Sequence, residues 1–440
     1  MIREAIVVVD LGYGDQGKGT VTDFFVRARG AHTVVRYNGG AQAGHNVVTD
    51  DGRHHTFAQF GAGMFVPGVE TWLTAHVAVQ PWAMVVEAAH LARVGVTDAF
   101  ARTRIDADAP VITPFHRASN RLRERARGEG RHGSCGMGVG EAVRDARTLG
   151  DADVLRVRDL CDGAVVRTKL RRVQERKRSE LQAELGDRGI ACEDATALSD
   201  RAMVDVYAGL LAVFVAAARV VDGAALAEVL RRPGAVVFEG AQGVLLDEWR
   251  GFHPHTTWST CTAENALGAL REHGYEGAVA RWGVVRAYAT RHGAGPMVTE
   301  DAGLSARVRD PHNRDDGWQG GFRVGWFDAV ATRYAMEVNG GVDALAVTCV
   351  DRLQGEREWK LATAYRMGDG TRVRALPVGA HGDLQHQAAM TAALREAAPE
   401  YRVTTTVGEA EAHLAAMSEE TGATVALVSI GPSARDKRWR

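Results

Sequence analysis

The stretch Val7–Thr20 constrains the fold of this chain more strongly than any other part of its 440 residues. It begins with Val7–Leu11, a largely β-branched segment without polar–apolar alternation, which is typical of a strand buried on both faces. Glycines and Lys18 follow directly, and the residues after them can form a helix. Glycines behind a buried strand let backbone N–H groups approach an anion, and the positive end of the next helix points to the same place. The stretch therefore predicts a turn that binds phosphate.

Two glycine patterns overlap in this turn. Residues 12–17 fit G-x-G-x-x-G, but the second expected strand, His32–Tyr37, ends in Asn38–Gly40 instead of the acidic residue that would hold a ribose. Residues 12–18 also fit G-x-x-x-x-G-K, although Gly19 stands where a P-loop has its magnesium-binding Ser or Thr. The turn departs from both patterns, and a dehydrogenase with a nicotinamide cofactor is disfavoured.

Two side chains near this turn are candidates for proton transfer. Asp15 lies among the expected phosphates, where a carboxylate is electrostatically costly unless it holds a cation or takes up a proton. His45 follows a second glycine-rich turn, Gly39–Gly44, and a histidine close to phosphates is a credible acid.

Strands and helices alternate along much of the chain, which favours an α/β fold. We expect one unit over residues 1–440, in which residues 151–233 are mainly helical. The other expected elements are the helices Lys18–Arg29, Pro81–Val94 and Ala202–Val221 and the strands Ala109–Pro114, Ala235–Phe238 and Val342–Val350.

Charge and cysteine usage exclude several classes of protein. The 53 basic residues are balanced by 55 acidic ones, which argues against a surface that binds polymeric nucleic acid. The five cysteines are scattered without a Cys-x-x-Cys pair, so neither a disulfide framework nor a zinc site is expected. The absence of a signal peptide and of a membrane-spanning apolar run favours a cytoplasmic enzyme that binds no membrane.

Gly14–Gly19 and Arg36–His45 resemble the strings GDEGKGK and RYQGGNNAGHT of the adenylosuccinate synthetase family. Further segments resemble strings of that family in the same order along the chain: Gly133–Glu141, Glu239–Asp247, Gly251–Thr257, Val284–Thr299, Thr348–Asp351 and Ser429–Pro432. The resemblance implies a large, mostly parallel central sheet flanked by helices, in a fold similar to that of P-loop NTPases. It also implies a homodimer in which an arginine from the partner completes each site, a part that Arg144 or Arg147 would take.

The reaction implied by the resemblance is phosphoryl transfer from GTP to the 6-oxygen of a purine nucleotide, followed by displacement of phosphate by an amine. The default substrates are IMP and L-aspartate, and the cofactor is Mg²⁺. The implied catalytic residues are Asp15, Lys18 and His45. The implied GTP-binding residues are Gly14, Gln16, Gly17, Lys18, Gly19, Thr20, Asp351, Ser429 and Gly431. The implied residues for the purine nucleotide are Gln42, Ser134, Cys135, Gln242 and Thr257, those for the metal are Asp15 and Gly44, and that for the amine is Arg323.

Departures from the family strings gather at the substrate loops. Ser134 and Cys135 replace two threonines of the family's T-T-G-R-G-I-G loop. Of the run T-T-G-R-R-R-R-x-G-W, which holds the carboxylates of aspartate in the family, Arg323 remains, and Arg314 would substitute if the loop is shifted. A cysteine, Cys349, replaces the lysine of T-K-L-D, so the preference for guanine is expected to be relaxed.

These departures leave two alternatives open beside the default reaction. One is a specialised family member that acts on another purine-like nucleotide, or uses an amine other than aspartate, in a secondary pathway. The other is a regulator that binds GTP without turnover.

Overall fold

The first strand lies at the centre of the fold. The computed structural model describes residues 3–186, 192–308, 318–405 and 410–440. Strand β1 (Arg3–Asp10) pairs in parallel with β8 (Gly234–Glu239) on one side and β9 (Ala278–Arg286) on the other. Val7 and Val9 pack into one apolar cluster and Ile6 and Val8 into another, because successive side chains of a strand point to opposite faces. The expected doubly buried strand is thus confirmed.

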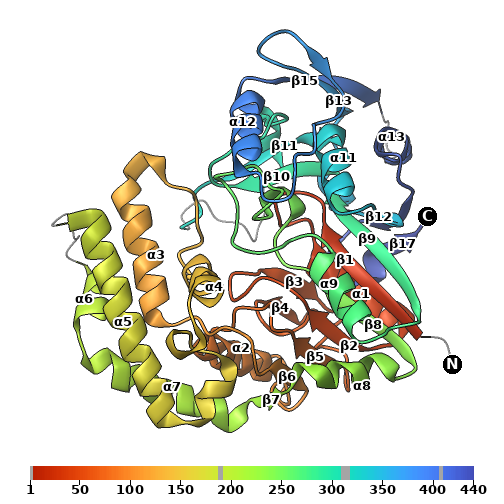
Figure 1. The fold of residues 1–440 in the computed structure, drawn as a ribbon. Coiled ribbons are helices and arrows are strands. Elements are labelled where there is room, and N and C mark those ends of the chain that lie inside the picture. Colours follow the sequence, from red (N-terminus) through yellow and green to blue (C-terminus); the bar gives the residue numbers. More distant parts are fainter. Residues whose placement is uncertain (1–2, 187–191, 309–317, 406–409) are drawn as a thin grey trace.

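Over the residues that the structure describes, the central sheet has ten strands, and all neighbouring pairs are parallel except the pair β16–β17 at one edge. Across the sheet the order is β17 (Lys437–Trp439), β16 (Val425–Ser429), β12 (Ala344–Thr348), β9, β1, β8, β2 (Ala31–Arg36), β5 (Glu70–Leu73), β6 (Thr103–Asp106) and β7 (Arg219–Val221). The predicted fold class, a large and mostly parallel sheet flanked by helices, is confirmed (Figure 1).

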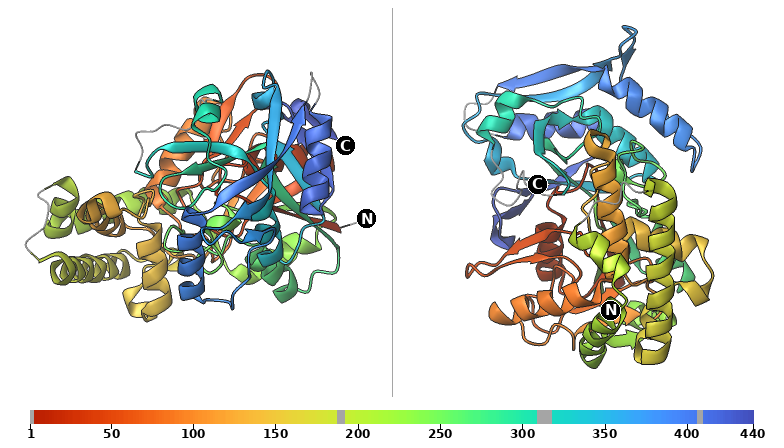
Figure 2. Two further views of the ribbon diagram at one scale, coloured as in Figure 1. Left: turned by 90° about the horizontal axis from the view of Figure 1, so that it is seen from above. Right: turned by 90° about the vertical axis from the view of Figure 1, so that its left-hand side faces the viewer.

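Helices cover the sheet and extend to one side of it. The first, α1 (Lys18–Arg29), packs on β1, β2 and β8, and five others, α3–α7, form a helical lobe beside the sheet (Figures 1 and 2). The lobe consists of α3 (Pro114–Arg127), α4 (Val139–Thr148), α5 (Gly163–Leu185), α6 (Glu193–Ser199) and α7 (Ala202–Ala217). The other α-helices of the described residues are α2 (Pro81–Arg93), α8 (Leu226–Arg231), α9 (Glu264–Glu272), α10 (Ala302–Arg307), α11 (Ala329–Val338), α12 (Leu384–Arg395) and α13 (Glu411–Thr421).

Two expected elements are wrong in their bounds. Ala109–Pro114 contains isolated bridges instead of a strand, and the strand lies earlier, at β6. The reason is that Pro110 offers no N–H to a ladder, while Pro114 starts α3 behind the capping side chain of Thr113. The helix expected to reach Val221 ends at Ala217, and the last residues form the edge strand β7.

A smaller sheet stands above the carboxyl ends of the central strands in Figure 1. It consists of β10 (Tyr288–His292), β11 (Phe322–Asp328), β13 (Glu358–Arg366), β14 (Arg372–Val373) and β15 (Ala398–Thr405). A separate hairpin, β3 (His45–Val48) with β4 (His54–Phe57), carries His45 at its start. Within the described part of the chain, no helix is both long and apolar enough to cross a bilayer.

Buried histidines make the stability of this fold sensitive to acid. His413 on α13 is fully buried, with Nε2 3.2 Å from the carbonyl oxygen of Ala287, and burial lowers its pKa to about 4. Because the unfolded chain then binds the proton more tightly, stability falls as the pH drops from about 6.5 toward 4. We expect the wild type to lose about 2 kcal/mol more of its unfolding free energy between pH 7 and pH 5 than a His413→Gln variant. Urea titrations at both pH values measure this difference, and equal losses would contradict it.

Candidate active site

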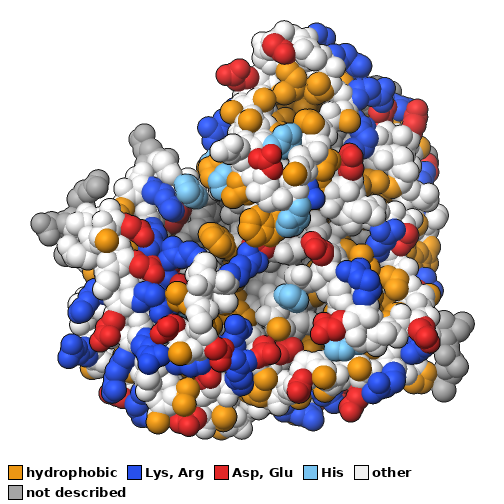
Figure 3. Space-filling view, in the orientation of Figure 1, with side chains coloured by type: hydrophobic (Ala, Val, Ile, Leu, Met, Phe, Trp, Pro, Cys, Tyr) orange, Lys and Arg blue, Asp and Glu red, His pale blue; other side chains and the backbone are white. Residues whose placement is uncertain are grey.

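The carboxyl ends of neighbouring parallel strands meet at one edge of the central sheet, where ligands of open α/β sheets bind. A cavity of about 950 Å³ opens there, and Figure 3 shows the molecule hollowed between the helical lobe and the smaller sheet. Its wall includes every residue that the sequence assigns to the site except Gln16 and Arg323. Residues from the start, middle and end of the chain are thus brought together around one space.

The first wall of the cavity is the turn between β1 and α1. Asp10, at the end of β1, is buried, and its carboxylate accepts the backbone N–H groups of Gly12 and Gly14 at 2.9 and 3.3 Å. It also accepts the N–H of Gln16 at 3.2 Å and pairs with Nζ of Lys18 at 2.7 Å. Several donors expected to serve a ligand phosphate therefore point to a carboxylate of the chain itself.

Asp15 is the acidic side chain that this turn presents to the cavity. Its backbone is left-handed, with φ 60°, and its side chain is about one-third exposed. Nε2 of His292 lies 3.5 Å from its carboxylate, and Nε of Arg286 donates to its backbone carbonyl at 2.6 Å. Gln16 faces inward instead, where its amide bonds the carbonyl of Gly14 and the N–H of Arg286. The turn thus presents one carboxylate and is braced from β9 and β10.

His45 is held by a buried carboxylate. Its Nδ1 lies 2.6 Å from Oε1 of Glu239, and the other oxygen of Glu239 accepts the N–H of Ala62 at 3.0 Å. Burial lowers the pKa of His45 to about 4, while His45 and Arg36 keep the pKa of Glu239 below its usual range. The imidazole is therefore neutral, with its Nδ1 proton on the side of Glu239 and Nε2 as its second nitrogen.

A Glu239→Gln variant tests this arrangement. The glutamine side chain is uncharged and has one acceptor oxygen, so it cannot accept from His45 and Ala62 with two separate oxygens as Glu239 does. A hydrogen bond to a charged group contributes about 1.5–3 kcal/mol. We expect turnover to fall about tenfold to a hundredfold with the fold retained. Steady-state kinetics and circular dichroism measure the two quantities, and unchanged turnover would show that Glu239 does not support His45.

Two glutamines, Gln42 and Gln242, also line the cavity. The side-chain amides of Gln42 and Gln242 have no hydrogen-bond partner among the described residues, although their atoms are buried. Asn38 fixes both turns that carry them, because its side chain bonds the N–H and carbonyl of Ala241 and the hydroxyl of Ser259. Paired donor and acceptor groups without partners are suited to the edge of a nucleobase.

The end of the chain closes the cavity near Thr20. The buried Nζ of Lys437 bonds the hydroxyl of Thr20 and the carbonyls of Gly431 and Ser433, and burial lowers its pKa to about 8. The cavity wall here also includes Cys349, Asp351 and Ser429. This corner therefore combines a carboxylate, a hydroxyl and carbonyl groups.

The third glycine-rich loop, residues 133–141, is bonded to side chains of α3. Glu124 accepts the N–H groups of Gly133 and Ser134 at 3.1 and 3.3 Å, and the amide of Asn120 bonds the hydroxyl of Ser134. Arg127, a cavity residue, pairs with Glu124. Ser134 and Cys135 line the cavity, and the backbone N–H groups of Gly133 and Ser134 are bonded to Glu124 of α3.

Arg323 does not line the cavity. Its guanidinium bonds Glu300 and the carbonyls of Gly293 and Gly295, the latter two at 3.0 and 2.9 Å. Arg314 lies outside the described residues, and so do Asp316 and Gly317, the first two residues of the string 316–328 that stands where the family has its arginine-rich run. Trp318 follows them and stacks near the guanidinium groups of α3, against Gly136 of the third loop.

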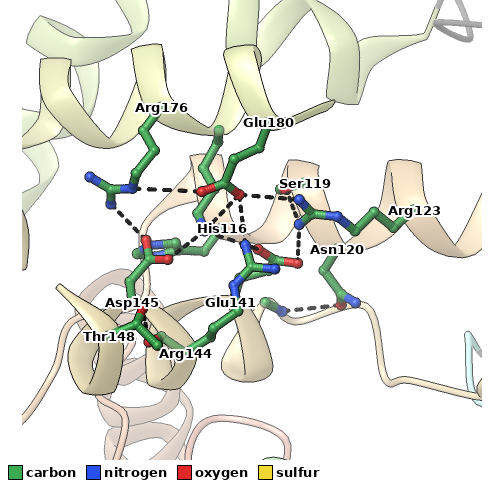
Figure 4. Close-up of polar contacts among 12 residues, drawn as sticks. His116, Ser119, Asn120, Arg123, Glu141, Arg144, Asp145, Thr148, Arg176 and Glu180 are labelled. Carbon is green, nitrogen blue, oxygen red and sulfur yellow. Dashed lines mark hydrogen bonds and ion pairs between the residues drawn. The ribbon is translucent and has the colours of Figure 1, made fainter. Parts of the chain in front are cut away.

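An ionic cluster supports the cavity from the helical lobe (Figure 4). It joins α3, α4 and α5 through these ionisable residues: His116, Arg123, Glu141, Arg144, Asp145, Arg176, Lys177, Glu180 and Glu184. Arg144 pairs with Glu141 and Glu180, and Arg147 pairs with Glu248, so both arginines have partners within their own chain.

Sequence reasoning assigned no role to Asp10, Glu239 or Lys437. Asp10 carries a usable signal, because a charge inside an apolar strand just before a glycine turn demands a partner. Glu239 occupies the same position at the end of β8. Lys437 carries no such signal, since its partners lie far away in the sequence.

Comparisons with known proteins identify the family of this chain. The family model described as adenylosuccinate synthetase matches residues 7–438. Adenylosuccinate synthetases of Saccharopolyspora erythraea and of Neisseria meningitidis serogroup C, strain FAM18, are 32% and 30% identical, over 97% of this chain and 97% and 96% of their own lengths.

Solved structures share the fold. A fully ligated adenylosuccinate synthetase from Plasmodium falciparum superposes with a TM-score of 0.77 at 19% identity, covering 99% of both chains. The succinoaminodeoxyadenylate synthetase of cyanophage S-2L, bound to dGMP and to dATP as an energy donor, has a TM-score of 0.61 at 17% identity, covering 100% of this chain and 96% of its own. The chain therefore belongs to the adenylosuccinate synthetase family of GTP-dependent carbon–nitrogen ligases.

Proposed function

We propose that this ligase transfers the γ-phosphoryl group of GTP to the 6-oxygen of IMP and joins the activated purine to L-aspartate, giving adenylosuccinate, GDP and phosphate. The observation that carries the proposal is a cavity of about 950 Å³ that unites the β1–α1 turn, His45, Asp351 and two glutamines whose amides have no partner among the described residues. That volume lies at the upper end of the range for small-molecule sites, as two nucleotides require.

Each step then has a group in reach of the cavity. Asp15 takes the proton from N1 of the purine, which makes its 6-oxygen the nucleophile toward the γ-phosphorus. Lys18 balances the charge of the moving phosphoryl group, which is the main task in such transfers. Nε2 of His45 carries a proton toward the departing GDP oxygen, since nearby phosphates raise its proton affinity. The amine then attacks C6 and phosphate leaves with the 6-oxygen.

Mg²⁺ fits the oxygen groups of the site. Asp15 and Gly44 belong to the same cavity wall and would offer the ion a carboxylate and a backbone carbonyl. The described residues contain no group of three or more His, Cys, Asp or Glu that could hold a metal by itself. Magnesium needs few protein ligands, because waters and substrate phosphates complete its shell. When bound, the ion neutralises charge on the phosphoryl oxygens.

A substrate panel tests the proposed reaction. Purified protein is incubated with GTP or ATP, one purine nucleotide and one amine, and released phosphate and product mass are measured. We expect phosphate release only when GTP, IMP and aspartate are present together, with a product of the mass of adenylosuccinate. Release with a different combination would replace these substrates, and no release with any combination would refute the proposal.

The bonding of Arg323 favours one second candidate, a ligase that uses an amine other than aspartate. Aspartate presents two carboxylates, which are best held by free guanidinium groups. Arg323 instead bonds Glu300 and two backbone carbonyls. Within the panel, a non-aspartate amine that supports faster phosphate release than aspartate would establish this candidate.

Three further properties are part of the proposal. We expect a homodimer, because the resemblance to the family implies that an arginine of the partner completes each site. We also expect a cytoplasmic enzyme, because its substrates are soluble nucleotides. The balanced charge favours small nucleotides and not polymeric nucleic acid as partners. Sedimentation measures the oligomeric state, and a monomer at working concentration would contradict that part.

A further inference from the structure

The turn between β1 and α1 contains its own anion. The carboxylate of Asp10 accepts three backbone N–H groups, from Gly12, Gly14 and Gln16, and pairs with Nζ of Lys18 at 2.7 Å. Asp10 is 1% exposed, and the side chain of Lys18 is 3% exposed. Convergent N–H groups of this kind form a nest for an oxyanion. Here the chain fills the nest with a carboxylate.

The packing around Asp10 shields its carboxylate from solvent. Gly243, from the turn after β8, lies so close that a Cβ atom there would stand 2.6 Å from Oδ1 of Asp10 and 2.2 Å from the carbonyl oxygen of Gly12. The turn after β8 thus covers the carboxylate, and its charge is compensated by Lys18 and the three amides. The carboxylate of Asp10 therefore lies directly behind the part of the cavity wall that the turn forms.

We propose that Asp10 is a positioning residue for phosphoryl transfer, which holds Lys18 and the turn in their working geometry. The same carboxylate lowers the affinity of the site for the nucleoside triphosphate that donates the phosphoryl group. The proposal rests on the proposed function. An ammonium has three N–H donors, so Lys18 can keep one on Asp10 and direct others to phosphate oxygens in the cavity. Holding it in place removes the need to order it during the reaction. The same carboxylate repels the triphosphate.

These two effects give opposite changes in affinity and turnover. In Asp10→Asn the repulsion disappears, and we expect the dissociation constant of GDP with Mg²⁺ to fall roughly threefold to tenfold. Lys18 loses its fixed partner, and we expect kcat to fall about tenfold to a hundredfold. A merely structural carboxylate would instead weaken binding and slow turnover together, since a distorted turn serves both poorly.

Asp247 offers a matched control. Its carboxylate is equally buried and also accepts three backbone N–H groups, those of Trp249, Arg250 and Cys261. No salt bridge joins it to a lysine or arginine among the described residues. Asp247→Asn therefore reports the general effect of neutralising such a carboxylate, and we expect it to lower the melting temperature without tightening GDP binding.

The experiment combines calorimetry of GDP with Mg²⁺, kcat and KM for GTP with the substrates found in the panel, and thermal melting of the three proteins. Tighter GDP binding with lower kcat in Asp10→Asn supports the proposal. Weaker binding with lower kcat, or no change in either, overturns it. If Asp10→Asn does not fold, Asp10→Ser is measured in its place, and loss of folding in both variants overturns it as well. Calorimetry measures the effect of the Asp10 charge on GDP binding even if the wild type shows no turnover. A failure of the proposed function can therefore be distinguished from a failure of this proposal.

Discussion

Replacement of Asp15 by asparagine is expected to reduce turnover by about 10²- to 10⁴-fold, the usual contribution of a proton-transfer group. Asparagine is isosteric with aspartate but cannot remove the N1 proton of the purine. It also accommodates the left-handed backbone at this position, where φ is 60°, so the turn should keep its shape. The loss should therefore appear in kcat, with the fold unchanged by circular dichroism.

Phosphate release with the substrates found in the panel measures this loss. Asp205→Asn is a suitable control, because Asp205 is an exposed residue of α7 outside the cavity wall. That variant should retain wild-type turnover. Full phosphate release by the Asp15→Asn protein would remove Asp15 from the mechanism.

Replacement of Lys177 by methionine is expected to lower the unfolding free energy by about 3–5 kcal/mol. Lys177 is 0% exposed, and its Nζ lies 3.0 Å from Glu141, 2.6 Å from Asp145 and 3.4 Å from Glu180. Methionine replaces most of the aliphatic part of the lysine side chain but carries no charge. The buried carboxylates then lose one of the cations that compensate their charge. Removing one partner of a buried ionic network is strongly destabilising, because the remaining charges stay buried without compensation. Replacing a whole network by apolar residues often changes the stability little.

Urea unfolding followed by circular dichroism measures this change. Arg167→Met on the same helix is the control, because the Arg167–Asp205 pair is exposed, and its loss should cost less than about 1 kcal/mol. Equal stabilities of the two variants would contradict the assigned role of the cluster. A pronounced loss in Lys177→Met would also explain how the lobe supports the site, since Arg123, Glu141 and Arg144 belong both to the cluster and to the cavity wall.

The local features of the site could be predicted from the sequence because they depend on spacing alone. A β-branched run, a glycine turn and a lysine within Val7–Thr20 predicted β1, the turn and α1, and the structure has all three. The carboxyl ends of parallel strands lie at one edge, so motifs that follow Val7–Leu11, His32–Tyr37 and Ala235–Phe238 were bound to meet there. Family membership followed from the order of these strings.

What each side chain does within that edge was decided by the tertiary structure. Arg323 was expected to meet a substrate carboxylate, but the turn at Gly293 and Gly295 offers it carbonyls at hydrogen-bond distance. Lys437 meets Thr20 across 417 positions of sequence, and Glu239 meets His45 across 194. A buried charge takes whichever partner packing brings within about 3 Å, and packing between distant segments is not written in their spacing. Sequence alone therefore determined which motifs gather at the edge, and only the tertiary structure decided which of their groups face the cavity and which are bonded to the chain itself.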